Sequence, residues 1–204
     1  MKNILTIIII TIFISCQQHS KDSSTKASSI IRILPDTLYN WEAKDEFNRY
    51  TWKKEFAQKL GLDDIEKSND SLEIRVWWEG AMYSPRQVWI VRNRRDSSTA
   101  ERIDYYTHYD STVKLDSMHV YKQTPIADSW SEYYKTIDLA KFWNVPFQYK
   151  LNGKYGCADG ESVTIEMYNN RKYKIVTYPC YMMYRDSAFY KDFASLVTNI
   201  IALK

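Results

Sequence analysis

Two stretches of alternating apolar and polar residues near the C-terminus constrain the fold most strongly, because they match each other across a short turn. The stretches 163–167 and 173–177 flank Asn169-Asn170-Arg171. With these three residues as the loop, the register gives three pairs on one face: Met167 with Tyr173, Ile165 with Ile175, and Val163 with Thr177. It places Glu166 opposite Lys174 on the other face. The pattern predicts a half-buried antiparallel β-hairpin.

The rest of the chain between residues 30 and 204 predicts more strands, with helices before, among and after them. Strands are expected at 72–79, 87–92, 100–109 and, less regularly, 115–121. Helices are expected at 43–60 before Gly61, from the capping box Ser129-Trp130-Ser131-Glu132 towards Pro146, and from Ser187 onwards. The last of these carries an apolar stripe of Phe189, Phe193, Leu196, Val197, Ile200 and Ile201. This order predicts one α+β domain over 30–204, with an antiparallel sheet, a C-terminal β-hairpin and about three helices.

The first 16 residues have the pattern of an export signal. Lys2 precedes an apolar stretch of eleven residues, Ile4–Ile14, which is followed by Ser15 and Cys16. A signal core is about 7–15 residues long, whereas a helix that crosses a bilayer needs roughly 20. The stretch therefore predicts a signal peptide over 1–15.

Phe13-Ile14-Ser15-Cys16 resembles the lipobox of bacterial lipoproteins, although Phe13 stands where leucine is usual. The resemblance implies cleavage before Cys16 and attachment of acyl chains such as palmitate to that residue, so that Cys16 contacts membrane lipid. Two acyl chains already suffice for stable anchoring. An ordinary secretory signal with a coincidental cysteine and an uncleaved anchor helix are the alternatives.

The residues after Cys16 predict a flexible tether over 17–29, because none of them is a large apolar side chain. Thirteen such residues have a mean reach of about 20 Å. In lipoproteins of Gram-negative bacteria, an aspartate after the lipidated cysteine often retains the protein in the inner membrane. Gln17 takes that place here, which favours the outer membrane of the cell envelope.

The charge is nearly balanced. Loss of residues 1–15 removes one lysine and no acid, which lowers the formal net charge from +3 to +2. Such a chain lacks the basic surface that nucleic acid requires, so no nucleic-acid partner is expected.

Cys157 and Cys180 are the two cysteines that follow Cys16. In an oxidising compartment such a pair tends to form a disulfide, and the hairpin register brings Cys180 opposite Gly160, close to Cys157. Two free thiols and a redox pair are the alternatives, and the redox pair lacks a Cys-x-x-Cys spacing.

No recognised catalytic or cofactor-binding motif occurs, so no cofactor is expected. Two weaker hypotheses remain. His108, Asp110, Asp116 and His119 are spaced so that they could hold a divalent metal ion, although solvent-exposed or core histidines are the favoured interpretation. Asp159, Glu161 and Glu166 could supply the acid and base of a glycosidase, although a turn at Asp159-Gly160 is the favoured interpretation.

Aromatic residues are abundant, with 7 Trp and 17 Tyr. Trp77 falls on the charged face of the strand 72–79 beside Arg75, and Trp89 is a candidate for the same face. Exposed tryptophan beside arginine is typical of a recognition surface. The alternative, which the apolar strand 87–92 favours, is that a helix covers this face and buries both rings.

Three functions follow from these observations. The first is a non-catalytic envelope lipoprotein that binds a protein partner. The second is a glycan-binding lipoprotein that uses Trp77, Trp89, Tyr105, Tyr106 and Tyr109. The third is a hydrolase built on the three carboxylates. The absence of a catalytic motif favours the first.

Overall fold

The structure is a computed structural model, which describes residues 29–80, 85–95, 97–151 and 160–204. Seven strands form one sheet in the order β1-β7-β6-β2-β3-β4-β5. All neighbouring strands are antiparallel except β1 and β7, which are parallel. The strands are β1 (Ile31–Ile33), β2 (Leu72–Glu79), β3 (Arg86–Asn93), β4 (Ser98–Asp110), β5 (Thr112–Gln123), β6 (Ser162–Asn169) and β7 (Lys172–Pro179).

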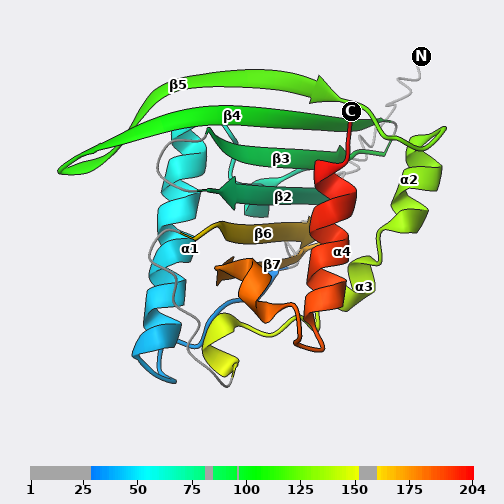
Figure 1. Cartoon of the computed structure of the whole chain (residues 1–204). Helices are drawn as coiled ribbons and strands as arrows, with labels where there is room; N and C mark the ends of the chain where they lie inside the picture. Colours follow the sequence, from blue (N-terminus) through cyan, green and yellow to red (C-terminus); the bar gives the residue numbers. More distant parts are fainter. Residues whose placement is uncertain (1–28, 81–84, 96, 152–159) are drawn as a thin grey trace, which may run out of the picture.

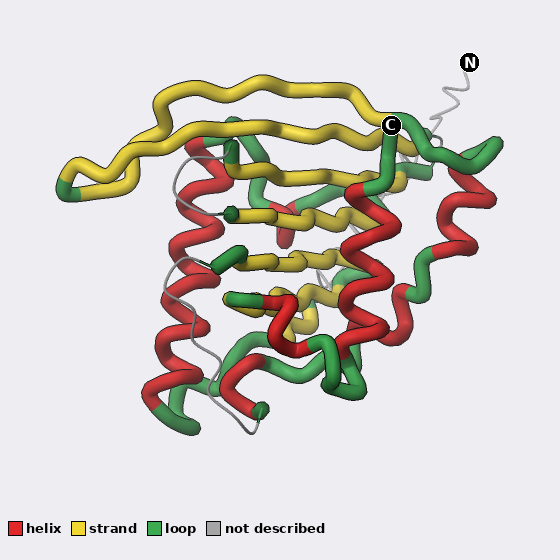
Figure 2. Tube along the Cα trace, viewed as in Figure 1, coloured by secondary structure: helices red, strands yellow, loops and turns green. Residues whose placement is uncertain are grey.

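Helices cover both faces of the sheet (Figures 1 and 2). The long helix α1 lies on one face, and α4 lies on the other with α2 and α3 beside it. This architecture confirms the predicted α+β class, the antiparallel sheet and the C-terminal hairpin. The helical segments are α1 (Trp41–Lys59), α2 (Trp130–Thr136), α3 (Leu139–Phe142), α4 (Tyr190–Ile201) and the 3-10 turns η1 (Ile65–Lys67), η2 (Gln148–Lys150) and η3 (Tyr181–Tyr184).

Local signals fix the helix ends. Asn40 begins α1 by accepting a hydrogen bond from the backbone N–H of Ala43 (2.8 Å), and Gly61, at φ +73°, follows its C-terminal end. Ser129 caps α2 as predicted, through the N–H of Glu132 at 3.2 Å. The helix α4 begins at Tyr190, three residues after the expected Ser187.

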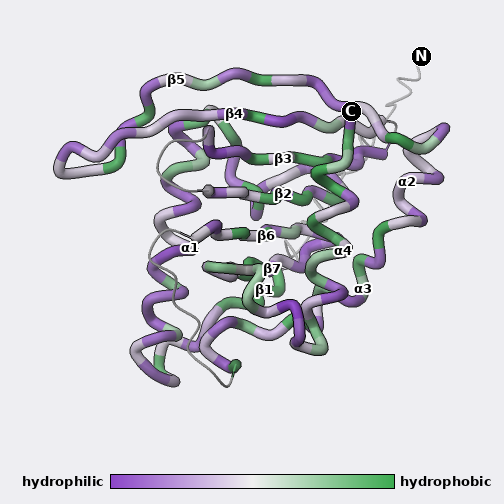
Figure 3. The backbone as a smooth tube through the Cα atoms, viewed as in Figure 1, coloured by the Kyte–Doolittle hydropathy of each residue, from purple (hydrophilic) through white to green (hydrophobic). Residues whose placement is uncertain are grey.

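The two faces of the sheet differ in chemistry. The predicted apolar stripe of α4 packs on the larger apolar core, which contains Phe193, Leu196, Val197 and Ile200. In contrast, α1 is mostly hydrophilic along its length (Figure 3). It contributes Phe56, Ala57 and Leu60 to a smaller apolar cluster. The polar partners that α1 also meets are described below, because they organise the candidate site.

The predicted hairpin forms, but its predicted register was wrong by one residue. The turn contains two residues, Asn170 and Arg171, at φ +46° and +66°. These positive values match the tight hairpin turn that suits the twist of the strands. The observed pairs are Met167 with Lys174, Ile165 with Val176, and Val163 with Tyr178. Since helices bury both faces, separation of apolar from polar residues could not identify the register.

One consequence is that Glu166 and Lys174 do not meet. Lys174 lies on the face covered by α4, where its ammonium donates to the backbone carbonyls of Phe142, Trp143 and Val145 at 3.1, 2.9 and 2.5 Å. Burial, together with the nearby charge of Lys172, lowers the pKa of Lys174 to about 8. The ammonium group therefore fixes the end of α3 to the sheet.

Several predictions fall on residues that the structure does not describe. The signal peptide, Cys16 and most of the tether precede residue 29, and Cys157 and Asp159 fall within 152–159. The backbone N–H of Cys180 donates to the carbonyl of Glu161 at 2.7 Å, one residue from the predicted neighbour Gly160. The disulfide between Cys157 and Cys180 stays a prediction. Within the described ranges, no helix is both long and apolar enough to cross a membrane.

Candidate functional site

A layer of charged and polar side chains is buried between α1 and the sheet. Alternation along β2 directs Glu73, Arg75 and Trp77 towards α1, and the same alternation directs Glu166 of β6 to this face. Arg75, Trp77 and Glu166 are 1%, 0% and 2% exposed. Buried charges are costly unless they are paired, so their partners decide what this layer can do.

Glu166 is held by two donors within the sheet. The indole Nε1 of Trp77 donates to one carboxylate oxygen at 2.7 Å, and the hydroxyl of Tyr173 donates to the other at 3.0 Å. Burial beside this carboxylate raises the pKa of Tyr173 well above its ordinary value, so the hydroxyl remains a donor. This carboxylate therefore has a structural role in the packing of β2, β6 and β7.

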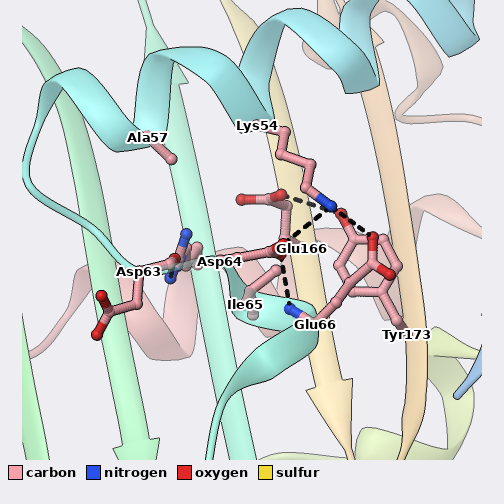
Figure 4. A pocket seen from close by; sticks show the side chains of 9 residues that line it. Lys54, Ala57, Asp63, Asp64, Ile65, Glu66, Glu166 and Tyr173 are labelled. Carbon is pink, nitrogen blue, oxygen red and sulfur yellow. Dashed lines mark hydrogen bonds and ion pairs between the residues drawn. The ribbon is translucent and has the colours of Figure 1, made fainter.

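Glu66 occupies a second buried position, in η1 beneath α1 (Figure 4). It accepts hydrogen bonds from the hydroxyl of Tyr50 at 2.5 Å, from Lys54 at 3.3 Å and from Arg32. Burial opposes ionisation of Glu66, but the Tyr50 and Arg32 hydrogen bonds and the Lys54 charge lower its pKa below the ordinary value. A cavity of about 10 Å³ beside Glu66 is too small for anything larger than a water molecule.

A wider groove of about 620 Å³ opens next to this cavity, between the segment 63–70 and strands β2 and β3. Its floor contains an ion pair between Glu73 and Arg75 at 2.7 Å. Arg92 lies 3.5 Å from Glu73, and Arg94 pairs with Asp70 at 2.6 Å. The lining is four cations, four anions and two neutral polar residues: Lys67, Arg75, Arg92, Arg94, Asp63, Asp64, Asp70, Glu73, Ser68 and Asn69. The charges balance, so the groove does not present the single-sign field that would attract an ion.

The predicted recognition surface of Arg75, Trp77 and Trp89 was wrong. Trp77 belongs to the cluster under α1, whereas Trp89, at 6% exposed, belongs to the core on the opposite face. Arg75 donates to the carbonyl of Asp63 at 2.7 Å and to Glu73 at 2.9 Å. The physical reason is that α1 covers the charged face of β2 and buries Arg75 and Trp77, as the alternative interpretation allowed for Trp77, whereas Trp89 points to the opposite face and is buried in the core beneath α4.

The carboxylates proposed for a hydrolase do not converge. Glu161 is exposed just before β6, whereas Glu166 is buried within that strand. Five residues of extended chain separate them by about 16 Å, beyond the roughly 5–9.5 Å that glycosidase carboxyls span. The third carboxylate of this hypothesis, Asp159, lies outside the described residues.

The histidines lie on the β4–β5 hairpin. His108 contacts Asp116, and His119 pairs in register with Asp104. Asp110 forms an ion pair with Lys114 at 2.6 Å. Among the residues with described positions, no three His, Cys, Asp or Glu side chains gather in a way that could hold a metal ion. The metal hypothesis gains no support from this arrangement.

Glu46 joins α1 to η2. Its carboxylate accepts from the backbone N–H groups of Gln148 and Tyr149, each at 3.4 Å. Burial raises the pKa of Glu46 from 4.5 to about 7, and the two long hydrogen bonds offset only part of this effect. The folded state therefore holds the Glu46 proton more tightly than the unfolded state does.

Stability should accordingly fall as the pH rises from about 4.5 to 7, since the unfolded chain then loses the Glu46 proton first. A shift of this size corresponds to at most about 3 kcal/mol. Glutamine at position 46 resembles the protonated carboxyl group, so Glu46→Gln should remove this part of the fall in stability with rising pH. Urea unfolding of both proteins at pH 5 and pH 8 measures the difference. An identical pH dependence in the two proteins would contradict the assignment.

The β4–β5 hairpin extends beyond the other strands of the sheet (Figure 1), and most residues of β5 are exposed. Its strands contain 13 and 12 residues, and β5 forms one edge of the sheet. Within the described chain, no strand pairs with the outer side of β5. Lys59 donates a hydrogen bond to the backbone carbonyl of Val113 at 3.1 Å, and just after the strand Thr124 and Lys204 exchange backbone hydrogen bonds at 2.5 and 3.0 Å. A long, uncovered edge strand is a template for pairing with another chain.

Apolar side chains lie along this edge. Met118 and Val120 pair in register with Tyr105 and Ile103, so they lie on the face of the sheet that carries the cluster under α1. They are 42% and 53% exposed. On the other face, the guanidinium of Arg102 lies 4.6 Å from the ring centroid of Tyr121 and holds that ring in place. We call β5 and these side chains the β5 edge.

Sequence reasoning identified the two strands but missed the β5 edge. Edge position depends on which strands pair, and the connection from β5 to β6 carries the chain to the opposite side of β2. The signal that was present is the recurrence of apolar residues, Leu115, Met118 and Val120, within the largely polar stretch 114–123.

Comparison of the chain with family models, with curated proteins and with solved structures finds no match. No relative therefore assigns a role to any of these residues.

Proposed function

We propose that the protein is a lipid-anchored component of the bacterial cell envelope that binds a protein partner and has no catalytic role. The observation that carries the binding role is the β5 edge, where backbone pairing groups and apolar side chains are both accessible. Backbone hydrogen bonds to an added strand supply affinity, and the side chains supply specificity. The lipobox-like segment that ends at Cys16 supports the anchor.

The geometry of the sheet separates the proposed anchor from the proposed binding edge. The described chain begins at residue 29 and immediately forms β1, at the sheet edge opposite β5. Six strand spacings of about 4.8 Å place the two edges roughly 29 Å apart. An anchor before β1 would therefore leave β5 accessible to another envelope protein.

Glycan binding and hydrolysis receive less support. Stacking on sugar rings needs exposed aromatic rings, and Trp77, Trp89 and Tyr105 are buried. Tyr106 and Tyr109 remain exposed, at 43% and 78%, but both lie on the hairpin and neither lines the groove beside the segment 63–70. A hydrolase needs free carboxylates, and Glu166 is committed to Trp77 and Tyr173.

Site-specific photocrosslinking in intact cells tests the binding role. A photoreactive amino acid at position 120 should give a discrete crosslinked product. The same group at Lys191, an exposed residue of α4, serves as the matched control and should give none. Met118→Lys should reduce the yield at position 120 about tenfold, since a charge at the centre of an interface costs at least 1.4 kcal/mol. Equal crosslinking from positions 120 and 191 would argue against the β5 edge.

A further inference from the structure

A second group of exposed apolar side chains lies in the turn before α1 and at the first residue of that helix. Leu38, Tyr39 and Trp41 are 93%, 64% and 69% exposed. We call residues 38–41 the α1 entry turn. Three large apolar side chains within four residues at this exposure are unusual for a monomeric soluble surface and indicate contact with a partner or a membrane.

The entry turn is held in a defined conformation. The side chain of Asp36 accepts from the backbone N–H of Leu38 at 3.1 Å, and Asn40 caps α1. The ring of Tyr39 lies 5.4 Å from that of Tyr149, in a tilted arrangement. The apolar side chains are therefore displayed by a hydrogen-bonded turn.

The position of the turn identifies what it faces. Figures 1 and 3 show that α1 begins at the end of the molecule where β1 and β7 lie, away from β5. Residue 29, where the described chain begins, leads directly into β1 at the same end. The predicted tether of 13 residues, 17–29, has a mean reach of about 20 Å. An acylated Cys16 would thus hold this end of the molecule close to the bilayer.

The chemistry of the turn fits the bilayer interface. Tryptophan and tyrosine prefer the headgroup level, where the ring is in contact with acyl chains and its polar group with water. The charges beside the turn are three acidic residues against one lysine, Asp36, Glu42 and Asp45 against Lys44, so the contact is not one that would be driven by anionic lipid. We propose that the entry turn inserts Leu38, Tyr39 and Trp41 into the membrane interface and orients the β5 edge away from it. The inference rests on the proposed lipid anchor.

Quenching of tryptophan fluorescence by lipid tests this orientation. The full-length acylated protein is reconstituted into phosphatidylcholine vesicles with or without bromine atoms near the top of the acyl chains. The wild type should lose emission in brominated vesicles, and Trp41→Phe should abolish that loss. The matched control is Trp52→Phe, which removes a half-buried tryptophan from the same helix towards its other end, stacked on Phe56. This variant should retain the quenching.

Flotation of the same vesicles separates failure of the anchor from failure of the orientation. A protein that does not float with the vesicles, or that carries no acyl mass, contradicts both the anchor and this inference. A protein that floats but shows equal quenching in wild type and Trp41→Phe overturns the orientation alone. In that case the entry turn faces water or another protein.

Discussion

Replacement of Trp77 by alanine is expected to lower the free energy of unfolding by about 4 kcal/mol. The indole is fully buried and lies edge-on to the ring of Tyr105, with a centroid distance of 6.4 Å. The ammonium of Lys53 lies 4.8 Å from its ring centroid, and its Nε1 donates to Glu166 at 2.7 Å. Alanine would leave a cavity and would also remove a donor from a buried carboxylate, so both losses contribute.

Thermal or urea unfolding measures this effect. A change of this size corresponds to a fall in melting temperature of roughly 8–16 °C for a domain of this length. Trp41→Ala is the control, because that side chain is 69% exposed and its loss should change stability by no more than about 0.5 kcal/mol. Trp77→Phe separates the two contributions, since phenylalanine fills most of the space but cannot donate to Glu166. A wild-type unfolding midpoint in Trp77→Ala would show that α1 does not bury this face.

Replacement of Cys16 by alanine is expected to release the protein from the membrane completely. The proposed anchor is covalent, and each buried methylene of an acyl chain contributes about 0.8 kcal/mol. The α1 entry turn offers three exposed apolar side chains, which bury far less apolar surface than acyl chains and cannot replace them. Membrane association should therefore depend on the sulfur atom of one residue.

Fractionation of cells that produce the wild type or Cys16→Ala measures this dependence, and intact mass of the native product detects the acyl chains directly. Cys157→Ala is the matched control, since it removes a different cysteine and should leave the protein in the membrane fraction. A native product that begins at Met1, or that carries no acyl mass, would contradict the anchor. So would membrane retention of a Cys16→Ala protein from which the signal peptide had been removed.

Much of the fold could be predicted because its elements have strong local signals. The apolar stripe of α4 and the strand β2 were visible in the sequence, and the structure confirms both, although both faces of β2 are buried and not one alone. The strand β1 was missed because it contains only three residues, Ile31–Ile33, and depends on pairing with β7 for its conformation. The hairpin register was missed because its decisive feature is a two-residue turn with positive φ at Asn170 and Arg171, and not its hydrophobic pattern.

The buried polar layer was missed for a different reason. Charged residues on β2 predict a face in contact with solvent. The face of α1 that packs on them also contains a charged residue among its apolar ones. Lys53 lies within the stripe formed by Tyr50, Phe56 and Leu60, yet it is 2% exposed and pairs with Glu79 at 2.5 Å. Hydrophobic periodicity cannot detect an interface in which both sides bring polar groups.

The pairing of polar groups beneath α1 has a consequence for how the helix can sit. Apolar surfaces tolerate sliding, whereas hydrogen bonds and ion pairs hold only over a narrow range of distance and angle. Displacement of α1 by one turn, about 5.4 Å, would separate Glu66 from Tyr50 and Lys53 from Glu79. Each charge that lost its partner would be a buried, unpaired ion in a medium of low polarity. The polar contacts therefore hold α1 in a single position along the strands, which an apolar interface alone would not do.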